Sequence, residues 1–421
     1  MSNDNSYKEN HYVPQWYQRR FLPQRGEQKF CYLDLSPQSF TDPNGIAHEK
    51  KNLFRWGTTS CFKQTDLYTT KFVNFESTEI ERFFFGRVDS QGRAAVEYFA
   101  NFEHPSVDSE AFHALLNYMS VQKLRTPKGL AELSELANLK NKNTALLAMQ
   151  RFQNLHCATW TECVWAIAET ADTDSGFIIS DHPITVYNED CFPVSDWCRG
   201  WRDPEIWRTG THTLFPLSRT KILILTNLSW VRNPYSKAIA LRPNPNPLRT
   251  AMFNFTQIQT GRLLSAVEVS QINFIIKKRA FRYIAAAQES WLHPENHIPS
   301  EHWRKLNERY LLMPDPRSVT FTREIVVGYS HGRSDVFDEY GRRPGQKSFK
   351  DETLAKKEWR TSLAFQGEFA RLVGPKRRGR AFEFGKPDAT EDDSDFHKYH
   401  LGLEEKYLPK GKRSHRDRRA T

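Results

Sequence analysis

The sequence predicts an α+β fold, in which strands and helices occupy separate stretches of the chain. Strand-like segments come first, a long block with helical periodicity follows, and strand-like segments return before a final long helix. Such runs of one element type favour α+β over a regularly alternating parallel sheet. The chain has 421 residues, of which 38% are hydrophobic and 13% aromatic, and this is enough apolar surface for a substantial core.

The N-terminal half divides into a strand-like part and a helical part. Residues 29–35, KFCYLDL, alternate like a short strand, and the turn formers of 37–52 indicate a loop or hairpin turn. From about residue 75 the apolar residues recur with a period near 3.6, which predicts helices. The helical segments are 76–102, 106–127 with Ser106 or Asp108 as its cap, 128–155 and 158–170.

The period shortens again after this helical block. Residues 176–188, 211–218 and 221–227 are predicted strands, and KILILTN at 221–227 is so continuously apolar that both of its faces should be buried. The tryptophan-rich stretch 196–207 contains Gly and Pro, which favours a packed loop. A last long helix, 266–292, is expected to close the compact part.

We predict a main domain at residues 1–310, a small C-terminal extension at 311–371 with an edge strand near 318–329, and a flexible basic tail at 372–421. The formal net charge is +10, and residues 371–421 alone hold 14 Lys/Arg against 9 Asp/Glu. About half of the basic excess therefore lies at the C-terminal end. A basic chain favours polyanionic partners such as nucleic acid.

The sequence lacks the motifs and segments that are typical of several classes of protein. The polar N-terminus carries no signal peptide, and no run of about 18 apolar residues occurs, so we expect a cytoplasmic protein without membrane association. The six cysteines form no C-x-x-C pair, which favours reduced structural thiols. There is no P-loop, G-x-G-x-x-G, G-x-S-x-G or H-E-x-x-H motif, and hence no signature of a nucleotide or flavin cofactor.

Polar residues embedded in apolar sequence are the candidates for a functional site. An unpaired buried polar group costs about 1 to 3 kcal/mol, so these residues should converge on one another, on a ligand or on an ion. Glu81 and Asp89 lie about 80° apart around a helix axis, and Gln122 and Arg125 are neighbours on one helix face. The candidate catalytic residues are His11, Glu81, Asp89, Gln122, Arg125, Ser180 and Asp181.

The same segments carry a resemblance. The stretches HYVPQWYQRRF (11–21), QKLRTP (122–127) and FIISDHP (177–183) are similar to motifs of a bacterial family catalogued as domain of unknown function 4238, with coverage from about 11 to 290. Asn10 stands where that family usually has a first His, and Asp89 stands in place of a usual Glu. Some similar members occur as stand-alone genes in anti-phage islands, so the resemblance implies host defence.

These residue types suggest a metal-dependent nuclease, in which Glu81, Asp89 and Asp181 bind Mg²⁺ or Mn²⁺. His11 would serve as general base, and Arg125 would neutralise charge that develops on the phosphate. The rival hypothesis is a non-enzymatic phage sensor or toxic effector whose polar pocket binds a phage component, which acts as the trigger.

Each of these residues also has an alternative interpretation, in which its role is purely structural. His11 can bond a backbone carbonyl, Glu81 and Arg125 can form a structural ion pair, and Asp181 can cap a turn. Trp197, Trp201 and Trp207 either stack bases or pack within a loop. The predicted phosphate-binding residues are Arg19 and Arg20 in the opening motif and Lys376, Arg377, Arg378 and Arg380 in the tail.

Overall fold

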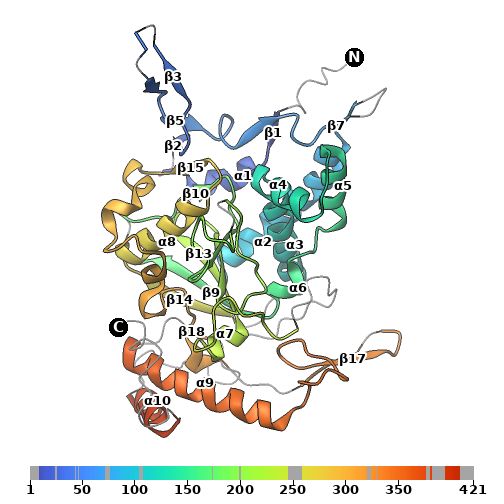
Figure 1. Ribbon diagram of the computed structural model, residues 1–421, viewed down its shortest axis with the longest axis vertical. Coiled ribbons are helices and arrows are strands. Elements are labelled where there is room, and N and C mark those ends of the chain that lie inside the picture. Colours follow the sequence, from blue (N-terminus) through green and yellow to red (C-terminus); the bar gives the residue numbers. More distant parts are fainter. Residues whose placement is uncertain are drawn as a thin grey trace.

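The predicted α+β class is confirmed by the computed structural model, in which two main sheets lie beside a helical layer and above a C-terminal helical base (Figure 1). The structure describes residues 9–23, 26–42, 44–45, 47–71, 76–103, 108–172, 174–198, 201–244, 258–319, 324–328, 330–375, 380–381 and 394–407.

The larger sheet has six strands in the order β11-β12-β13-β9-β14-β18. Neighbouring strands are antiparallel, except that β9 and β14 are parallel. The strands are β9 (Cys163–Thr170), β11 (Thr185–Asn188), β12 (Thr211–Pro216), β13 (Lys221–Asn227), β14 (Ile258–Leu264) and β18 (Arg380–Ala381).

Both faces of this sheet are covered. In β13, Leu223 and Leu225 belong to the core shared with the helical layer, whereas Ile222 and Ile224 belong to the core shared with helix α8 (Ala266–Arg279). Side chains of a strand alternate between faces, so a strand that is buried on both sides needs an almost continuous apolar run. The interpretation of 221–227 as a doubly buried strand is therefore confirmed.

The second sheet has four antiparallel strands in the order β10-β15-β2-β5. Its strands are β2 (Lys29–Asp34), β5 (Leu53–Gly57), β10 (Ile179–Ser180) and β15 (Tyr283–Ala286). The predicted hairpin turn is formed by β3 (Ser39–Thr41) and β4 (Ala47–Glu49), which lie in the arm at the top of Figure 1. Two further pairs join β1 (Glu9–His11) to β6 (Lys63–Thr65) and β7 (Thr70–Lys71) to β8 (Glu76–Ser77).

The helical layer begins after two short N-terminal turns, α1 (Gln15–Gln18) and η2 (Arg19–Phe21). Asp108 caps the central helix α3 (Ser109–Arg125) by accepting the backbone N–H groups of Glu110 and Ala111, as one of the two predicted caps. The other helices are η3 (Ile80–Phe85), α2 (Gly86–Ala100), α4 (Pro127–Leu136), α5 (Lys142–Arg151) and α6 (Cys157–Trp160).

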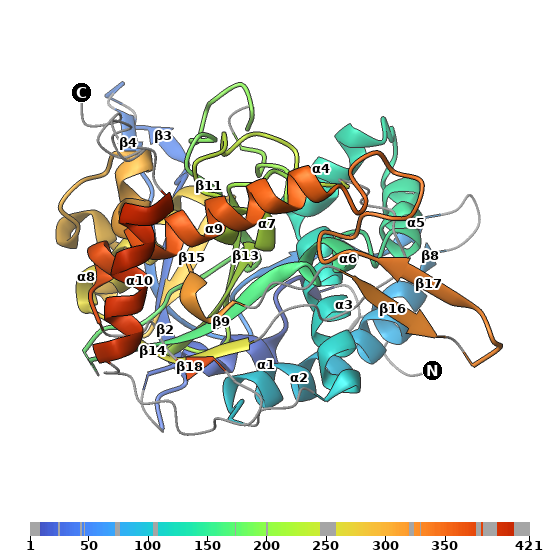
Figure 2. The ribbon, with the colours of Figure 1, turned by 90° about the horizontal axis from the view of Figure 1, so that it is seen from below.

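The C-terminal part closes one end of the molecule. Helix α9 (Glu352–Val373) crosses beneath the sheets and packs against α10 (Ser394–Tyr407) (Figure 2). The remaining elements are α7 (Leu228–Arg232), η4 (Glu289–Leu292), η5 (Pro294–His297), η6 (Trp303–Tyr310), η7 (Pro316–Ser318), β16 (Ile325–Gly328) and β17 (Ser334–Phe337). Strand β16 falls within the predicted edge strand and pairs with β17 in an antiparallel two-stranded sheet.

The predicted helix 128–155 is divided into α4 and α5, the predicted strand 176–188 is divided into β10 and β11, and three further segments differ from the sequence prediction. Residues 163–170 form the buried strand β9, although a helix was predicted over 158–170, because an apolar run without clear periodicity suits either element. The predicted helix 266–292 ends at Arg279 and is followed by β15. Residues 394–407, which were expected to belong to a flexible tail, form helix α10. Arg371 of α9 forms an ion pair with Glu404 of α10.

All six cysteines are buried free thiols, in line with their prediction as reduced structural residues. Within the described part of the chain, no helix has both the length and the apolar character needed to cross a bilayer.

Candidate functional site

The candidate site lies at a sharp corner between α3 and α4. Pro127 disfavours the helical conformation for the preceding residue, so Thr126 is extended and ends α3. The Thr126 hydroxyl then accepts the N–H of Gly129 at 3.1 Å and caps α4. A Cβ on Gly129 would lie 1.9 Å from the carbonyl oxygen of Lys123, so this close approach of the two helices requires glycine.

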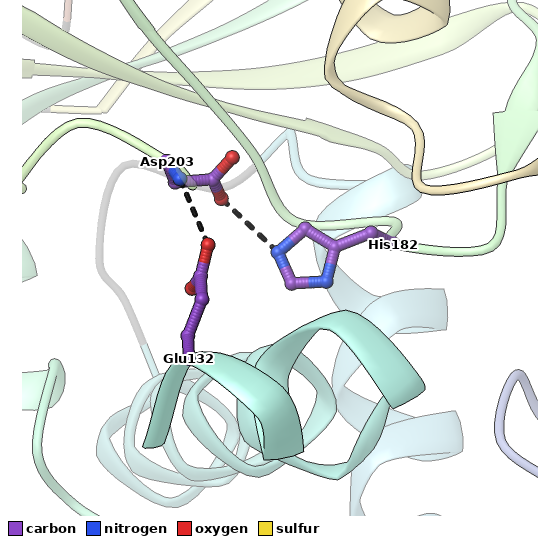
Figure 3. A group of neighbouring side chains, drawn as sticks. All are labelled: Glu132, His182 and Asp203. Carbon is purple, nitrogen blue, oxygen red and sulfur yellow. Dashed lines mark hydrogen bonds and ion pairs between the residues drawn. The ribbon is translucent and has the colours of Figure 1, made fainter. Parts of the chain in front are cut away.

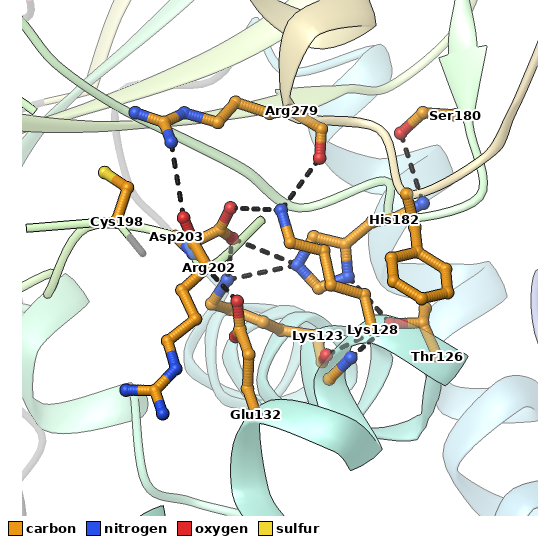
Figure 4. A network of polar contacts seen from close by, with 12 residues as sticks. Lys123, Thr126, Lys128, Glu132, Ser180, His182, Cys198, Arg202, Asp203 and Arg279 are labelled. Carbon is orange, nitrogen blue, oxygen red and sulfur yellow. Dashed lines mark hydrogen bonds and ion pairs between the residues drawn. The ribbon is translucent and has the colours of Figure 1, made fainter. Parts of the chain in front are cut away.

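Two lysines at this corner share one aspartate (Figure 4). Nζ of Lys128 lies 2.6 Å from Oδ1 of Asp203, and Nζ of Lys123 contacts Oδ2. The Lys128 and Asp203 side chains are 1% and 2% exposed. Lys128 also donates to the carbonyl oxygen of Arg279 at 2.8 Å. Because a buried charge without a partner is very costly, the two lysines and Asp203 depend on one another.

His182 completes the cluster from the turn after β10. Its Nδ1 lies 2.7 Å from Oγ1 of Thr126, and its Nε2 lies 3.1 Å from Nζ of Lys123 and 3.1 Å from Oδ2 of Asp203. A lysine ammonium can only donate and a carboxylate can only accept, so Nε2 accepts from Lys123 in one ring tautomer and donates to Asp203 in the other. Burial, together with the charge of Lys123, lowers the pKa of His182 to about 3, so its imidazole is neutral at physiological pH.

Glu132 on α4 adds a second carboxylate to the cluster. Its Oε1 accepts the backbone N–H of Asp203 at 2.8 Å. Oxygen and nitrogen atoms of Glu132, His182 and Asp203 all lie within 4.8 Å of one another (Figure 3), and no other group of three potential metal ligands does so among the described residues. Burial and the charge of Asp203 raise the pKa of Glu132. Burial alone would also raise the pKa of Asp203, but Lys123 and Lys128 hold it well below its usual range.

This arrangement suits two kinds of chemistry. A neutral imidazole and two carboxylates form a mixed nitrogen and oxygen ligand set for a divalent first-row metal. The hydrogen bond between Nδ1 of His182 and Oγ1 of Thr126 fixes the ring orientation, as the outer-shell partners of metal-bound histidines do. The two lysines are donors for phosphate oxygens once they leave Asp203.

Four predicted catalytic residues lie together in a neighbouring cluster on another face of α3. Nη2 of Arg125 lies 2.8 Å from Oδ1 of Asp89, and its Nε donates to Oε1 of Gln122 at 2.7 Å. Gln122 donates in turn to the carbonyl oxygen of Tyr12 at 2.9 Å. Burial raises the pKa of Glu81 to about 7, against the effect of Arg125, and its Oε2 has no hydrogen-bond partner among the described residues.

Ser180 and Asp181 shape the backbone. Oδ1 of Asp181 accepts the N–H of Phe281 at 2.8 Å, and Oδ2 accepts those of Arg282 and Tyr283 at 2.6 and 2.9 Å. Ser180 Oγ accepts the N–H of His182 at 3.2 Å. Asp181 thus binds a backbone segment about 100 residues away, which differs from the predicted alternative that it caps its own local turn.

The predicted metal set of Glu81, Asp89 and Asp181 is not gathered in the structure. Their carboxylate oxygens do not lie within 4.8 Å of one another, and those of Asp181 are occupied by backbone N–H groups. His11 lies in β1, where its ring bonds the backbone of residues 58 and 59, and burial lowers its pKa. Within the part of the chain that the structure describes, its Nε2 has no hydrogen-bond partner.

The predicted phosphate-binding residues differ in exposure and in their hydrogen-bond partners. Arg19 is exposed and donates to Gln15, whereas Arg20 donates to the carbonyl oxygen of Leu217 at 2.6 Å and pairs with Glu97. Arg20 is thus engaged within the protein. Lys376, Arg377 and Arg378 lie outside the described residues, as does the side chain of Arg380, whose backbone belongs to β18.

Sequence reasoning missed all five ionisable residues of the cluster at the corner. Lys123 and His182 stand inside the quoted motifs, next to the residues that were chosen, and Lys128 and Glu132 follow one motif at positions that share a helix face. A signal was therefore present for these four. Asp203 lies in a Trp-rich loop with no motif, and only the fold brings it to them.

The fold and the site together define an α+β protein with a buried cluster of charged and imidazole side chains where the helical layer meets the loops of the sheets. The family model described as "Protein of unknown function (DUF4238)" matches residues 9–290, and the chain belongs to this family. Comparison with curated proteins and with solved structures gives no match.

Proposed function

We propose that the protein is a metal-dependent phosphodiesterase that cleaves nucleic acid in the cytoplasm as part of anti-phage defence. One observation carries this proposal: Glu132, His182 and Asp203 come from three separate segments, and their ligand atoms lie within 4.8 Å of one another. Two lysines contact the same aspartate, so the proposed metal ligands lie beside side chains that are able to donate to phosphate.

The ligand set favours Mn²⁺ over Mg²⁺, because Mg²⁺ prefers oxygen ligands alone and imidazole suits later first-row metals. Such a cation would polarise the phosphate and lower the pKa of bound water. The two lysines already balance the two carboxylates in charge, so a divalent cation adds positive charge to a buried site. We therefore expect metal and an anionic phosphate group to bind together, each strengthening the binding of the other.

The loop that carries Asp203 supports a nucleic-acid substrate. Trp197 and Trp201 are 46% and 38% exposed, whereas Cys198 and Ile206 of the same stretch are buried, as expected for the packed loop predicted there. Arg208 lies 4.3 Å from the ring centroid of Trp197. Exposed aromatic rings beside arginines are suited to stacking on unpaired bases, and the net charge of +10 attracts polyanions.

The test uses purified full-length protein with single-stranded DNA, double-stranded DNA and RNA, in Mn²⁺, in Mg²⁺ or in EDTA. We expect cleavage in Mn²⁺ that EDTA abolishes and that His182→Gln and Glu132→Gln reduce by at least about 100-fold, the usual effect of losing a metal-bound group. Asp196→Asn, an exposed change on the same loop, is the matched control. Intact nucleic acid under every metal condition would contradict the proposal.

The defence role rests on the resemblance to stand-alone members of anti-phage islands, and plaque counts on cells that express wild type or His182→Gln test it.

The rival function, a non-enzymatic sensor of a phage component, is favoured by one observation. The His182 and Lys128 side chains are 0% and 1% exposed, so substrate reaches them only if the loop moves. Protection that persists in His182→Gln, with nucleic acid intact during infection, would support the sensor.

A further inference from the structure

Two cysteines contact each other in the loop that carries Asp203. Sγ of Cys198 donates to the carbonyl oxygen of Cys191 at 3.4 Å, and the two side chains also interact through a thiol–thiol hydrogen bond. Both side chains are buried, but Phe192 and Val194 between them are 45% and 77% exposed. The pair therefore lies directly beneath a surface turn, seven residues apart in the chain.

A buried arginine lies against this pair. Arg279, at the end of α8, donates to the carbonyl oxygen of Cys191 and forms a side-chain hydrogen bond with Cys198. It lies in the same network as Cys198 and Asp203 (Figure 4). A guanidinium next to sulfur favours the thiolate, which is the reactive form of cysteine.

The two thiols differ in acidity. The hydrogen bond from Cys191, assisted by Arg279, lowers the pKa of Cys198 to about 6, although burial opposes this. The same hydrogen bond, together with burial, raises the pKa of Cys191. In contrast, burial raises the pKa of Cys61 and of Cys157 to about 12. One cysteine of the pair is thus suited to attack and its neighbour to resolve.

We propose that Cys191 and Cys198 form a site of reversible oxidation, at which hydrogen peroxide converts the two thiols into a disulfide. The Cys198 thiolate attacks one peroxide oxygen, so an S–O bond forms, the O–O bond breaks and the departing hydroxide takes a proton to become water. The sulfur of Cys191 then attacks the sulfur of Cys198. An S–S bond forms, the S–O bond breaks, and the Cys191 proton leaves with hydroxide as a second water.

The modification reaches the charged cluster through Arg279. Nη1 of Arg279 donates to the carbonyl oxygen of Arg202 at 3.3 Å, and its own carbonyl oxygen accepts from Lys128. A disulfide removes the thiolate beside the guanidinium and shortens the sulfur separation to about 2.05 Å. Arg279 then loses its partner at Cys198, while its contacts with Arg202 and Lys128 connect it to the loop that carries Asp203. This inference goes beyond the proposed function and does not depend on nuclease activity.

The experiment treats the full chain at pH 7 with hydrogen peroxide, blocks free thiols by alkylation and digests with a protease that cleaves after glutamate. Glu189 and Glu205 bracket the pair, so both cysteines are released in one peptide, separate from Cys157 and Cys163. We expect this peptide to lose two hydrogens and to escape alkylation, and a reductant to restore both thiols.

Two variants make the result specific. Cys191→Ser should stop the reaction at the sulfenic acid of Cys198, which dimedone traps, whereas Cys198→Ser should give neither product. Cys157→Ser is the control and should form the disulfide as wild type does. Alkylation of Cys198 should be at least about tenfold faster than that of Cys157, because the thiolate is the nucleophile. Equal alkylation rates, or a 190–205 peptide that remains fully alkylated after peroxide, would overturn the proposal.

Discussion

Asp203 and Lys128 form an ion pair that is sealed from solvent, with Oδ1 and Nζ 2.6 Å apart and side chains 2% and 1% exposed. They are separated by 75 residues in the chain. The pair fixes the Trp-rich loop against the corner between α3 and α4, so it connects the stability of the fold to the geometry of the candidate site.

Removal of the Asp203 charge should destabilise the protein strongly. Asp203→Asn leaves Lys123 and Lys128 buried without their counter-ion, and breaking a buried pair costs about 3 to 5 kcal/mol. Unfolding in urea, followed by tryptophan fluorescence, measures this loss. Asp196→Asn on the same loop should change the free energy of unfolding by no more than about 0.5 kcal/mol. Equal stability of the two variants would mean that the buried pair contributes little.

Buried neutral histidines should make the protein sensitive to mild acid. Burial lowers the pKa of His212 to about 3. Below pH 6.5 this histidine therefore binds a proton in the unfolded chain but not in the folded chain. The contribution of neutral His212 to the free energy of unfolding is therefore complete above pH 6.5 and is lost as the pH drops towards 3. His212→Gln should reduce this slope by about 1.4 kcal/mol per pH unit below 6.5.

Urea unfolding of wild type and His212→Gln at a series of pH values between 7 and 5 checks the slope. His113→Gln removes an exposed histidine and should leave it as in wild type. Parallel curves for wild type and His212→Gln would show that this ring is protonated in the folded state.

Glu81 should limit stability at alkaline pH. Its pKa is raised from 4.5 to about 7 by burial, so its contribution to stability is complete below pH 4.5 and is lost as the pH rises through 7. Glu81→Gln should therefore raise the free energy of unfolding by about 3 kcal/mol at pH 8 and much less at pH 5. Urea unfolding at both pH values measures the difference, with exposed Glu79→Gln as control. A loss of nuclease activity in Glu81→Gln at unchanged fold would instead support its predicted catalytic role.

Asp181 should behave as a structural residue. Asp181→Ala strands three backbone N–H groups at residues 281–283 and should cost at least about 2 kcal/mol. Asp181→Asn keeps one acceptor oxygen and should lose less. Chemical denaturation ranks the two variants. Wild-type stability in Asp181→Ala, with nucleic-acid cleavage abolished, would favour the catalytic role predicted from the sequence.

The two arginines of the opening motif should separate into a binding residue and a structural one. Arg19→Ala should weaken binding of a fluorescent single-stranded oligonucleotide and lower the slope of log affinity against log salt by about one. Arg20→Ala should keep that slope and lose about 1 to 3 kcal/mol of stability, because its guanidinium is bonded to Leu217 and Glu97. Fluorescence anisotropy at several salt concentrations tests the pair, and equal slopes for both variants and wild type would exclude Arg19 from the contact.

Of the four segments expected to meet in one pocket, the structure joins Glu81 and Asp89 to Gln122 and Arg125, whereas the side chains of His11 and Asp181 bond to backbone groups elsewhere. Helical periodicity placed Gln122 and Arg125 on one face correctly, and Asp89 and Glu81 lie with them. It gave no weight to Lys123 on the adjacent face, which contacts Asp203 and His182. Local spacing reports which side chains share a helix face, but not which loop will be packed against that face.

Sequence alone determined the features whose cause is local. The strand at 221–227 follows from its apolar run, the turn at 37–52 from its Gly and Pro content, and the start of α3 from the capping residue Asp108. Tertiary structure decided the end of α8, where the Asp181 carboxylate, 100 residues distant, binds the N–H of Phe281 and the chain continues as β15. It also decided the pairing of Asp203 with two lysines, because the free energy that drives this pairing is the cost of burying their charges, and burial exists only once the segments have been packed together.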